Sequence, residues 1–342
     1  MQKFLFIAVA FSISSVSIAQ SDSSAFYLQK GLDEKAKGRR MESLKQLEKA
    51  YQFNNKNQQV VNEVAQAYLD LRLYAKAKEK FTELEKISPS AAIYKQLMNL
   101  NFNFRQFPDA IKYAELLKKA DASEKVAYYI GKSYYEQENV AQAIKYLDAA
   151  LKEDPTNADA AYLTGFAYTN MQNYKLAIPY FEKAIQLKPS ETRWIYEMAL
   201  VYYGMADEQN ALKFMLLAGD KGYKKDNDYL QNLAIAYVNA GKFPEGIQIY
   251  NQLLEKRPTD ISLLNQIAES CYDAKKYDDA ITYYDKMLSI DKTNTEALYM
   301  IGLSFLKKGE KEKGVALMDK AIELDPSLRS LKQEKKMPTG GL

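Results

Sequence analysis

The sequence of 342 residues contains no histidine, one cysteine, one tryptophan, 14 glycines and 9 prolines. The lack of histidine removes the commonest general base, the serine and cysteine triads that need imidazole, and nearly every zinc site. The single cysteine, Cys271, excludes intrachain disulfide bonds and CxxC redox or metal motifs. A hydrophobic content of 47% is too high for a disordered chain, and glycine and proline are too few for a fibrous one. These absences leave few enzyme mechanisms open.

The charges are nearly balanced, with 47 Lys and Arg against 44 Asp and Glu, and the two signs are interspersed. The densest basic runs, residues 35–40 and 332–336, are diluted by nearby acidic residues, as is typical of a solvated helix surface. A protein that binds nucleic acid or an anionic membrane usually carries a basic patch or block. We therefore expect no nucleic-acid partner.

The N-terminus has the order of a secretory signal peptide. One positive charge at Lys3 precedes an apolar run over residues 4–11, and Ser17 and Ala19 place small residues before Gln20. Four serines interrupt the stretch, whereas a permanent anchor needs about 20 consecutive apolar residues. We predict a signal peptide at residues 1–19, no membrane span after its cleavage, and an exported protein of the periplasm or cell envelope. The absence of N-x-Ser/Thr sequons favours a bacterial source.

The rest of the chain is organised by an internal repeat. Small residues recur at intervals of 33–35 residues, and the sequences around them align with one another. Nine such markers predict nine repeats; the markers are Ser43, Ala77, Ala110, Ala143, Ala177, Ala211, Gly246, Ala280 and Gly314.

Each repeat has the pattern of two amphipathic helices. In the fifth repeat Ala161, Gly165 and Tyr168 share one helix face, at i, i+4 and i+7. Ala177 and Phe181 begin the same pattern in the second helix, and small residues at such positions let two helices approach closely. Prolines fall where second helices must stop, so an all-α array is expected.

These residues resemble the tetratricopeptide repeat (TPR) family. The fifth repeat matches the family pattern fully, with Gly165, Tyr168, Ala177, Phe181, Ala184 and Pro189. The first and third repeats match least, because Glu34 takes a tyrosine position, and Met98 and Asn101 replace small and aromatic residues. The resemblance covers roughly residues 24–326. It implies an α-solenoid, a right-handed superhelix of about nine helix-turn-helix repeats.

The resemblance also suggests how the chain is divided. We assign residues 20–326 to the array and residues 327–342 to a capping helix and flexible tail. The repeats are expected to start near residues 24, 58, 91, 124, 158, 192, 227, 261 and 295.

Members of the TPR family bind partners in a concave groove lined by the first helices of the repeats. The positions that carry such contacts in the family hold many aromatic and amide side chains here. Tyrosine and arginine are preferred anchors of protein interfaces, and Asn can pair with a peptide backbone. The candidate binding residues are Lys95, Asn99, Tyr128, Lys132, Tyr135, Tyr162, Phe166, Asn170, Arg193, Tyr196 and Tyr203. Lys132 and Arg193 place cations beside these rings, which favours an extended, neutral to acidic ligand.

The functional prediction is a non-enzymatic scaffold or adaptor that binds a protein or extended peptide, in the assembly or secretion of envelope components. The alternative is a module that binds glycan or peptidoglycan, because stacked tyrosines also suit sugar rings. A competing interpretation of each tyrosine is that it packs between repeats. We find no catalytic constellation and expect no cofactor and no metal.

Three further patterns have structural interpretations. Lys95 and Asn99 match the start of a carboxylate clamp found in chaperone-binding TPR proteins, but Tyr129 stands where the clamp needs asparagine. Residues 226–228 resemble the start of a calcium loop, yet helix capping explains them better. Cys271 falls at a core position and is expected to be buried.

Overall fold

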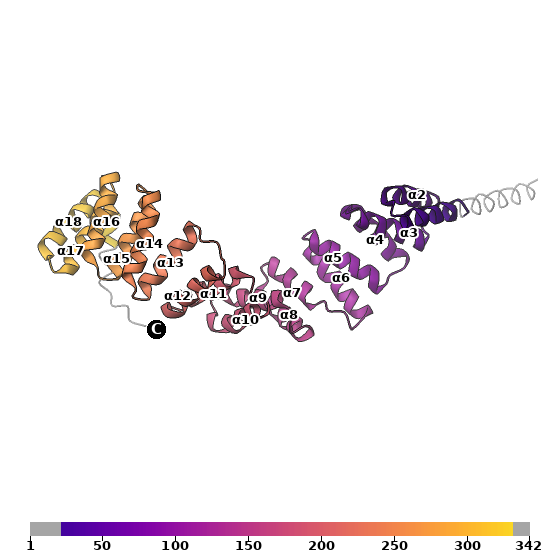
Figure 1. The fold of residues 1–342 in the computed structure, drawn as a ribbon, viewed down its shortest axis with the longest axis horizontal. Helices are drawn as coiled ribbons and strands as arrows, with labels where there is room; N and C mark the ends of the chain where they lie inside the picture. The colour runs from indigo at the N-terminus through magenta and orange to yellow at the C-terminus, as the bar shows by residue number, and fades with distance from the viewer. Residues whose placement is uncertain (1–21, 331–342) are drawn as a thin grey trace, which may run out of the picture. The chain divides into compact units, whose positions relative to one another are not determined.

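The computed structural model describes residues 22–330, and within that range the chain is helical, with no strand (Figure 1). It divides into two compact units, an N-terminal unit up to Asn173 and a C-terminal unit from Tyr174. The all-α prediction is confirmed. The predicted signal peptide and most of the predicted C-terminal cap and tail lie outside the described residues.

The N-terminal unit begins with helical residues 22–36, and from residue 58 to residue 170 each helix packs on the one before it. Within a repeat the first helix packs along the second, as α3 does on α4, and the second then contacts the first helix of the next repeat. The helices are α2 (Arg40–Phe53), α3 (Gln58–Asp70), α4 (Tyr74–Ile87), α5 (Ala91–Asn103), α6 (Phe107–Ala120), α7 (Ala127–Glu136), α8 (Val140–Glu153) and α9 (Ala158–Asn170).

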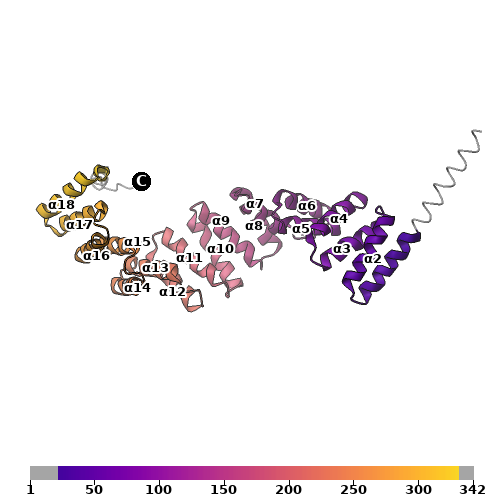
Figure 2. The same ribbon diagram turned by 90° about the horizontal axis from the view of Figure 1, so that it is seen from above.

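The C-terminal unit continues the same two-helix order (Figure 2). Pairs such as α11 and α12, or α17 and α18, lie side by side, and η1 packs on α18. Its helices are α10 (Tyr174–Leu187), α11 (Thr192–Gly204), α12 (Glu208–Asp220), α13 (Asn227–Asn239), α14 (Phe243–Lys256), α15 (Ile261–Asp273), α16 (Tyr277–Ile290), α17 (Thr295–Lys308), α18 (Lys311–Leu324) and the 3₁₀ helix η1 (Pro326–Leu328).

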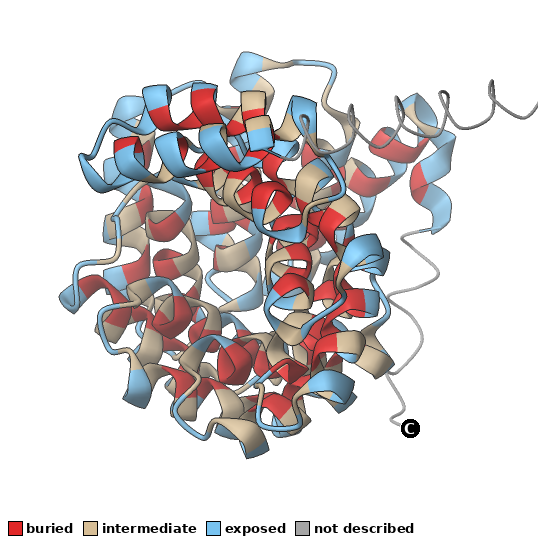
Figure 3. Cartoon of the chain, turned by 90° about the vertical axis from the view of Figure 1, so that its right-hand side faces the viewer, coloured by how far each residue is buried: buried red, intermediate tan, exposed pale blue. Residues whose placement is uncertain are grey.

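Small residues lie where paired helices approach most closely. Ala65, Ala77 and Ala143 are fully buried. At Gly131 on α7, an added Cβ would lie 2.9 Å from the backbone nitrogen of Leu147 on α8. Buried residues recur in every helix, as the red segments of Figure 3 show for the described part of the chain. The repeated small residues therefore set the spacing of the helix pairs.

Side-chain caps start five of the first helices. The side-chain oxygen accepts a backbone N–H from the first turn, which satisfies one of the donors that a helix start leaves free. The capping residues are Asn57, Asn157, Asp226, Asp260 and Asn294. Asp226 accepts from Tyr229 at 3.1 Å, which confirms the capping interpretation of residues 226–228.

The turn between the two helices of a repeat has one conformation throughout the described residues. Two residues before each second helix, one residue adopts a positive φ, which satisfies the carbonyls at the end of the first helix. Only three of these are glycine, although left-handed backbone is unfavourable for other residues. They are Gly38, Arg72, Arg105, Glu138, Gln172, Ala206, Gly241, Lys275 and Gly309.

The two least typical repeats compensate for their unusual residues in different ways. Glu34, at a tyrosine position, is buried and accepts hydrogen bonds from Arg39 and Lys37. This pairing with the Arg39 guanidinium lowers the pKa of Glu34 to about 2. Asn101, at the equivalent position of the third repeat, is fully buried and donates to the Leu97 carbonyl at 2.8 Å. Its amide oxygen has no hydrogen-bond partner among the described residues.

Cys271 is fully buried, as expected, and burial raises the pKa of its thiol to about 12. Within residues 22–330, no helix combines the length and apolar character needed to cross a bilayer.

Candidate functional site

In the N-terminal unit, the candidate binding residues lie on three first helices. Successive members are three or four residues apart, so each helix presents its set along one side. Helix α5 carries Lys95 and Asn99, α7 carries Tyr128, Lys132 and Tyr135, and α9 carries Tyr162, Phe166 and Asn170. We call these side chains, together with Phe102 and Tyr129, the aromatic face.

Aromatic contacts join α5 to α7. The Phe102 ring lies 5.2 Å from Tyr129, edge to face, and Tyr129 lies 5.8 Å from Tyr128. Lys132 holds its Nζ 5.6 Å from the Phe102 ring centre and 5.9 Å from that of Tyr128. Such cation–π contacts stabilise the ammonium without neutralising it. No carboxylate in residues 22–330 lies within ion-pair distance of Lys132, so the aromatic face keeps a positive charge there.

A second set of contacts joins α7 to α9. Phe166 lies 6.2 Å from Tyr135 and 5.8 Å from Tyr162. Asn170 donates from Nδ2 to the Tyr135 hydroxyl at 3.3 Å. Tyr162 is only 8% exposed, whereas Tyr135 and Phe166 are partly buried and Asn170 is exposed. A hollow of about 380 Å³ opens beside this set and is lined by Tyr135, Glu136, Glu138, Val140 and Asn170.

The phenol of Tyr128 is held in its neutral form. Burial raises the pKa of Tyr128 to about 12, and the Asp159 carboxylate acts in the same direction. A neutral phenol both donates and accepts hydrogen bonds. The aromatic face therefore combines hydroxyl and amide groups with ring surface, and the phenol of Tyr128 on it is uncharged.

The other two predicted cations are already paired. Lys95 binds both carboxylate oxygens of Glu124 at 2.9 Å, which raises the pKa of Lys95. Arg193 donates from Nε to Glu197 on the next turn of α11 at 2.8 Å. Glu197 thus balances the charge of Arg193, and the preference of Arg193 for an acidic ligand stays a prediction.

In the C-terminal unit, Tyr196 is the centre of a separate cluster. Its ring stacks on Tyr223 at 4.5 Å with an interplanar angle of 7°, and Tyr229 lies 6.2 Å away. Asn232 on α13 donates from Nδ2 to the Tyr196 hydroxyl at 2.5 Å. Tyr203, near the end of α11, is 51% exposed. Tyr196 is thus mainly engaged with its neighbours, whereas Tyr203 is accessible.

Phe102, Tyr129, Asn232 and Tyr223 contribute contacts but were absent from the predicted set. Phe102, Tyr129 and Asn232 stand at positions that the resemblance to the TPR family marks for partner contacts, so the sequence carried a signal for all three. Tyr223 lies in the loop between α12 and α13, and no periodic position indicates its stacking on Tyr196.

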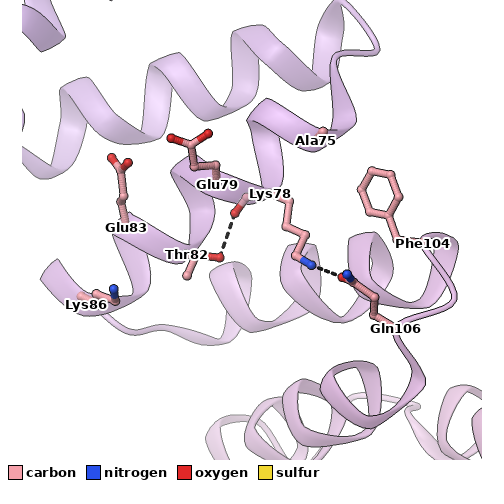
Figure 4. A pocket seen from close by; sticks show the side chains of 8 residues that line it. All are labelled: Ala75, Lys78, Glu79, Thr82, Glu83, Lys86, Phe104 and Gln106. Atoms are coloured by element: carbon pink, nitrogen blue, oxygen red, sulfur yellow. Dashed lines mark hydrogen bonds between the residues drawn. The ribbon is translucent and has the colours of Figure 1, made fainter.

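A larger hollow of about 550 Å³ lies on α4 and the turn before α6, away from the first helices (Figure 4). Lys78 reaches from α4 to the Gln106 side chain, and Thr82 bonds to the Lys78 carbonyl at 2.9 Å. The Glu83 carboxylate accepts from the Tyr51 hydroxyl and from Lys80. Lys78, Thr82 and Glu83, which line this hollow, are thus engaged in contacts within the protein. In residues 22–330, no group of His, Cys, Asp and Glu side chains could hold a metal ion.

Models of known protein families match three parts of the sequence. Two describe the tetratricopeptide repeat and match residues 128–192 and 295–328. A third describes subunit 3 of the anaphase-promoting complex (cyclosome) and matches residues 208–286. No curated protein matches the sequence.

Among solved structures, YrrB, described as a TPR protein with an unusual peptide-binding site, is 19% identical with a TM-score of 0.41. The match covers 56% of this chain and 98% of YrrB. The C-terminal part of a TPR protein from Cytophaga hutchinsonii is 17% identical, covering 80% of this chain and 99% of that one, with a TM-score of 0.48. PilW, described as a type IV pilus biogenesis factor, is 18% identical, covering 61% and 93%, with a TM-score of 0.43. At these identities the likeness concerns the fold alone.

Proposed function

The chain belongs to the tetratricopeptide repeat family, and on that premise we propose that it is a non-enzymatic scaffold that binds an extended segment of a partner protein. The binding surface is the aromatic face of α5, α7 and α9. Scaffolds of this kind hold a partner through side chains on successive first helices, and need no catalytic group. The proposal includes a role in assembling or secreting components of the cell envelope.

The observation that carries the proposal is the accessible part of the aromatic face. Tyr135, Phe166 and Lys132 are only partly buried, and Asn170 is exposed beside them. Aromatic rings supply a large rigid contact area, and the amide can pair with a peptide backbone. The ring contacts with Phe102 and Tyr162 hold these groups before a ligand arrives, so less conformational entropy is lost on binding.

The charge of the aromatic face favours a neutral or acidic segment. Lys132 has no ion-pair partner among the described residues, and two rings flank its ammonium. A partner carboxylate placed against Lys132 would pair with a partly desolvated cation, where an ion pair is stronger than at an open surface. Lys95 contributes less, because Glu124 already neutralises it.

The envelope location rests on the predicted signal peptide at residues 1–19, which the sequence supports through its charge, apolar run and small residues. Cleavage after Ala19 would separate the repeat array from this apolar segment. The single cysteine is compatible with an oxidising compartment, because it offers no partner for mispairing.

Glycan binding is the less favoured alternative. Sugar sites commonly use an exposed indole face, but Trp194 is only 5% exposed, near the start of α11. The closest ring stack, Tyr196 on Tyr223, is closed to an inserted sugar because the two rings already cover each other.

An affinity capture from the native envelope fraction tests the proposal. The bait is the wild-type protein or the double variant Phe102→Ala with Tyr135→Ala. We expect the variant to lose most of the captured partner, because truncating an interface anchor lowers affinity by roughly thirty-fold.

The matched control is Tyr74→Ala with Phe104→Ala. It also removes two rings, which are 48% and 42% exposed at the turns that flank α4 and α6 rather than on the aromatic face. The control should capture the partner at the wild-type yield. Equal capture by the aromatic-face variant, with its helicity intact, would refute the assignment of the binding surface.

A further inference from the structure

A small cavity lies between α11 and α13 of the C-terminal unit, with its floor on α12. Its volume is about 110 Å³. Leu200 and Tyr203 on α11 form one wall, Ile235 on α13 lies opposite, and Ala211 and Met215 on α12 close the bottom. The floor is part of the core, because Ala211 and Met215 are 1% and 2% exposed.

The mouth of the cavity carries unusual exposed apolar surface. Leu200 and Tyr203 are 39% and 51% exposed, and they stand on the same side of α11, three residues apart. Isolated exposed apolar residues are ordinary, but two of them flanking an apolar cavity indicate a binding site. The cavity opens on the side of the first helices, where partners of this fold class dock.

The size and chemistry of the cavity select its occupant. A dry protein cavity of roughly 150 Å³ holds benzene, so one of 110 Å³ admits a single aliphatic side chain but no indole. Its rim adds one directional group, Asn232. The Nδ2 of Asn232 is used by Tyr196, whereas its Oδ1 accepts no hydrogen bond from the described residues. That oxygen is placed to accept a backbone N–H from an extended chain.

Charges along the neighbouring first helices define the flanking residues of the ligand. The charged side chains on α13 and α15 are Asp228, Glu269 and Asp273, all acidic and exposed. None has an ion-pair partner in residues 22–330, and the nearest cation on α11, Arg193, is bound to Glu197. This surface therefore favours a basic ligand, unlike the aromatic face around Lys132.

We propose that this cavity binds one leucine, isoleucine or methionine side chain of an extended peptide segment that also carries lysine or arginine. The proposal rests on the proposed function and adds a second, basic-selective subsite to it. Neighbouring helices pack roughly 8–10 Å apart, and an extended chain advances about 3.3 Å per residue. The basic residue that meets Glu269 on α15 is then about three residues from the aliphatic one.

A displayed library of random dodecapeptides, selected on the purified protein, tests the proposal. Selected peptides are synthesised with a fluorescent label, and their affinities are measured by anisotropy. The protein variants are Leu200→Asp and Tyr203→Ala. Both residues are exposed, and with two variants the test still stands if one of them fails to fold. Ile290→Asp is the matched control, because Ile290 is 40% exposed at the end of α16 and far from the cavity in sequence.

We expect a class of peptides with an aliphatic and a basic residue at this spacing. Replacing the aliphatic residue by alanine should weaken binding by about ten-fold or more. Leu200→Asp and Tyr203→Ala should cause a loss of the same order, and Ile290→Asp none. A peptide lysine changed to glutamate should also bind more weakly.

The failure of this inference can be told apart from that of the proposed function. Peptides that bind Leu200→Asp and Tyr203→Ala as tightly as the wild type would overturn the cavity assignment while groove binding stands. Selection of acidic peptides by this surface would overturn the charge assignment. If no peptide is selected at all, both the inference and the proposed function are wrong.

Discussion

Gly302 on α17 and Gly314 on α18 face each other with their backbones in contact: a Cβ added to either would lie 2.7 Å from the carbonyl oxygen of the other. Real Cβ atoms do not approach a carbonyl oxygen so closely, and a backbone atom cannot move aside as a flexible side chain can. The pair holds the last two helices of the array at their observed separation. Met318 closes the same contact, since its Cγ would lie 2.8 Å from a Cβ at Gly302.

Gly302→Ala should therefore destabilise the last repeat. Overpacking typically costs about 1–3 kcal/mol, which exceeds the gain of roughly 1 kcal/mol from replacing glycine by alanine within a helix. Because repeat arrays unfold in parts, hydrogen exchange of the α17 and α18 amides is the direct measurement. Val315→Ala is the control, since Val315 lies next to Gly314 on α18 but is 41% exposed. Equal protection in Gly302→Ala and the wild type would contradict the close contact.

Asn101→Leu should stabilise the protein. The Asn101 amide is fully buried with an unpartnered oxygen, and a buried polar atom without a hydrogen bond costs about 1–3 kcal/mol. Leucine branches at Cγ as asparagine does and has no polar atom, so we expect a gain of about 1 kcal/mol, measured from the midpoint of urea unfolding. Asn103→Leu, at an exposed position of the same helix, should give no such gain. A loss of stability in Asn101→Leu would contradict the prediction.

The repeat organisation could be predicted from the sequence because it depends on side-chain volume and period. Small residues such as Ala77 and Ala143 must stand where helices touch, and they recur with the length of one repeat. The capping role of Asp226 was predictable for the same local reason, since a short acceptor before a helix finds the first-turn amides.

The left-handed turn residues and part of the site could not be predicted. Turns at Arg105 and Glu138 have positive φ without glycine, so composition gives no signal of the conformation that the two flanking helices impose. The ion pair of Arg193 with Glu197 and the stacking of Tyr223 on Tyr196 depend on rotamers and on a loop path. Periodicity predicts the side of a helix on which a residue lies. It does not predict whether a neighbouring side chain already binds that residue.

Acid should weaken the first repeat through Glu34. The Arg39 guanidinium lowers the pKa of Glu34 from 4.5 to about 2, so the charged pair stabilises the folded state above pH 4.5. That contribution is lost as the pH falls from 4.5 through the folded-state value near 2, because the unfolded chain then binds the proton more readily. The difference in Tm between the wild type and Glu34→Gln should therefore be largest at pH 7 and should shrink as the pH falls from 4.5 to about 2. Glu42→Gln, an exposed glutamate with a 3.8 Å contact to Lys45, should change Tm little at any pH. A Tm difference that does not vary with pH would contradict the ion-pair explanation.

Export should leave a mature chain that begins at Gln20. Ser17 and Ala19 are the small residues that a signal peptidase requires before the cleaved bond. The intact mass of the protein isolated from the envelope fraction of its native host measures the position. Changing Ala19 to a bulky residue, as in Ala19→Tyr, should block cleavage and retain residues 1–19. Isolation of unmodified wild-type protein that still carries Met1 would refute the prediction.

Tyr162→Ala and Tyr135→Ala should separate stability from binding on the aromatic face. Both tyrosines contact Phe166, at 5.8 Å and 6.2 Å, but Tyr162 is only 8% exposed, whereas Tyr135 is partly buried. Truncating a buried aromatic side chain removes its transfer free energy and leaves a cavity, so Tyr162→Ala should cost about 3–5 kcal/mol. Tyr135→Ala should lower the free energy of unfolding by no more than about 1 kcal/mol, because water can fill the space that the ring leaves. Thermal melts of the two variants measure stability, and capture of the partner measures binding. Equal and small losses of stability would mean that Tyr162 is as free to meet a ligand as Tyr135, and the binding surface would then extend deeper between α7 and α9.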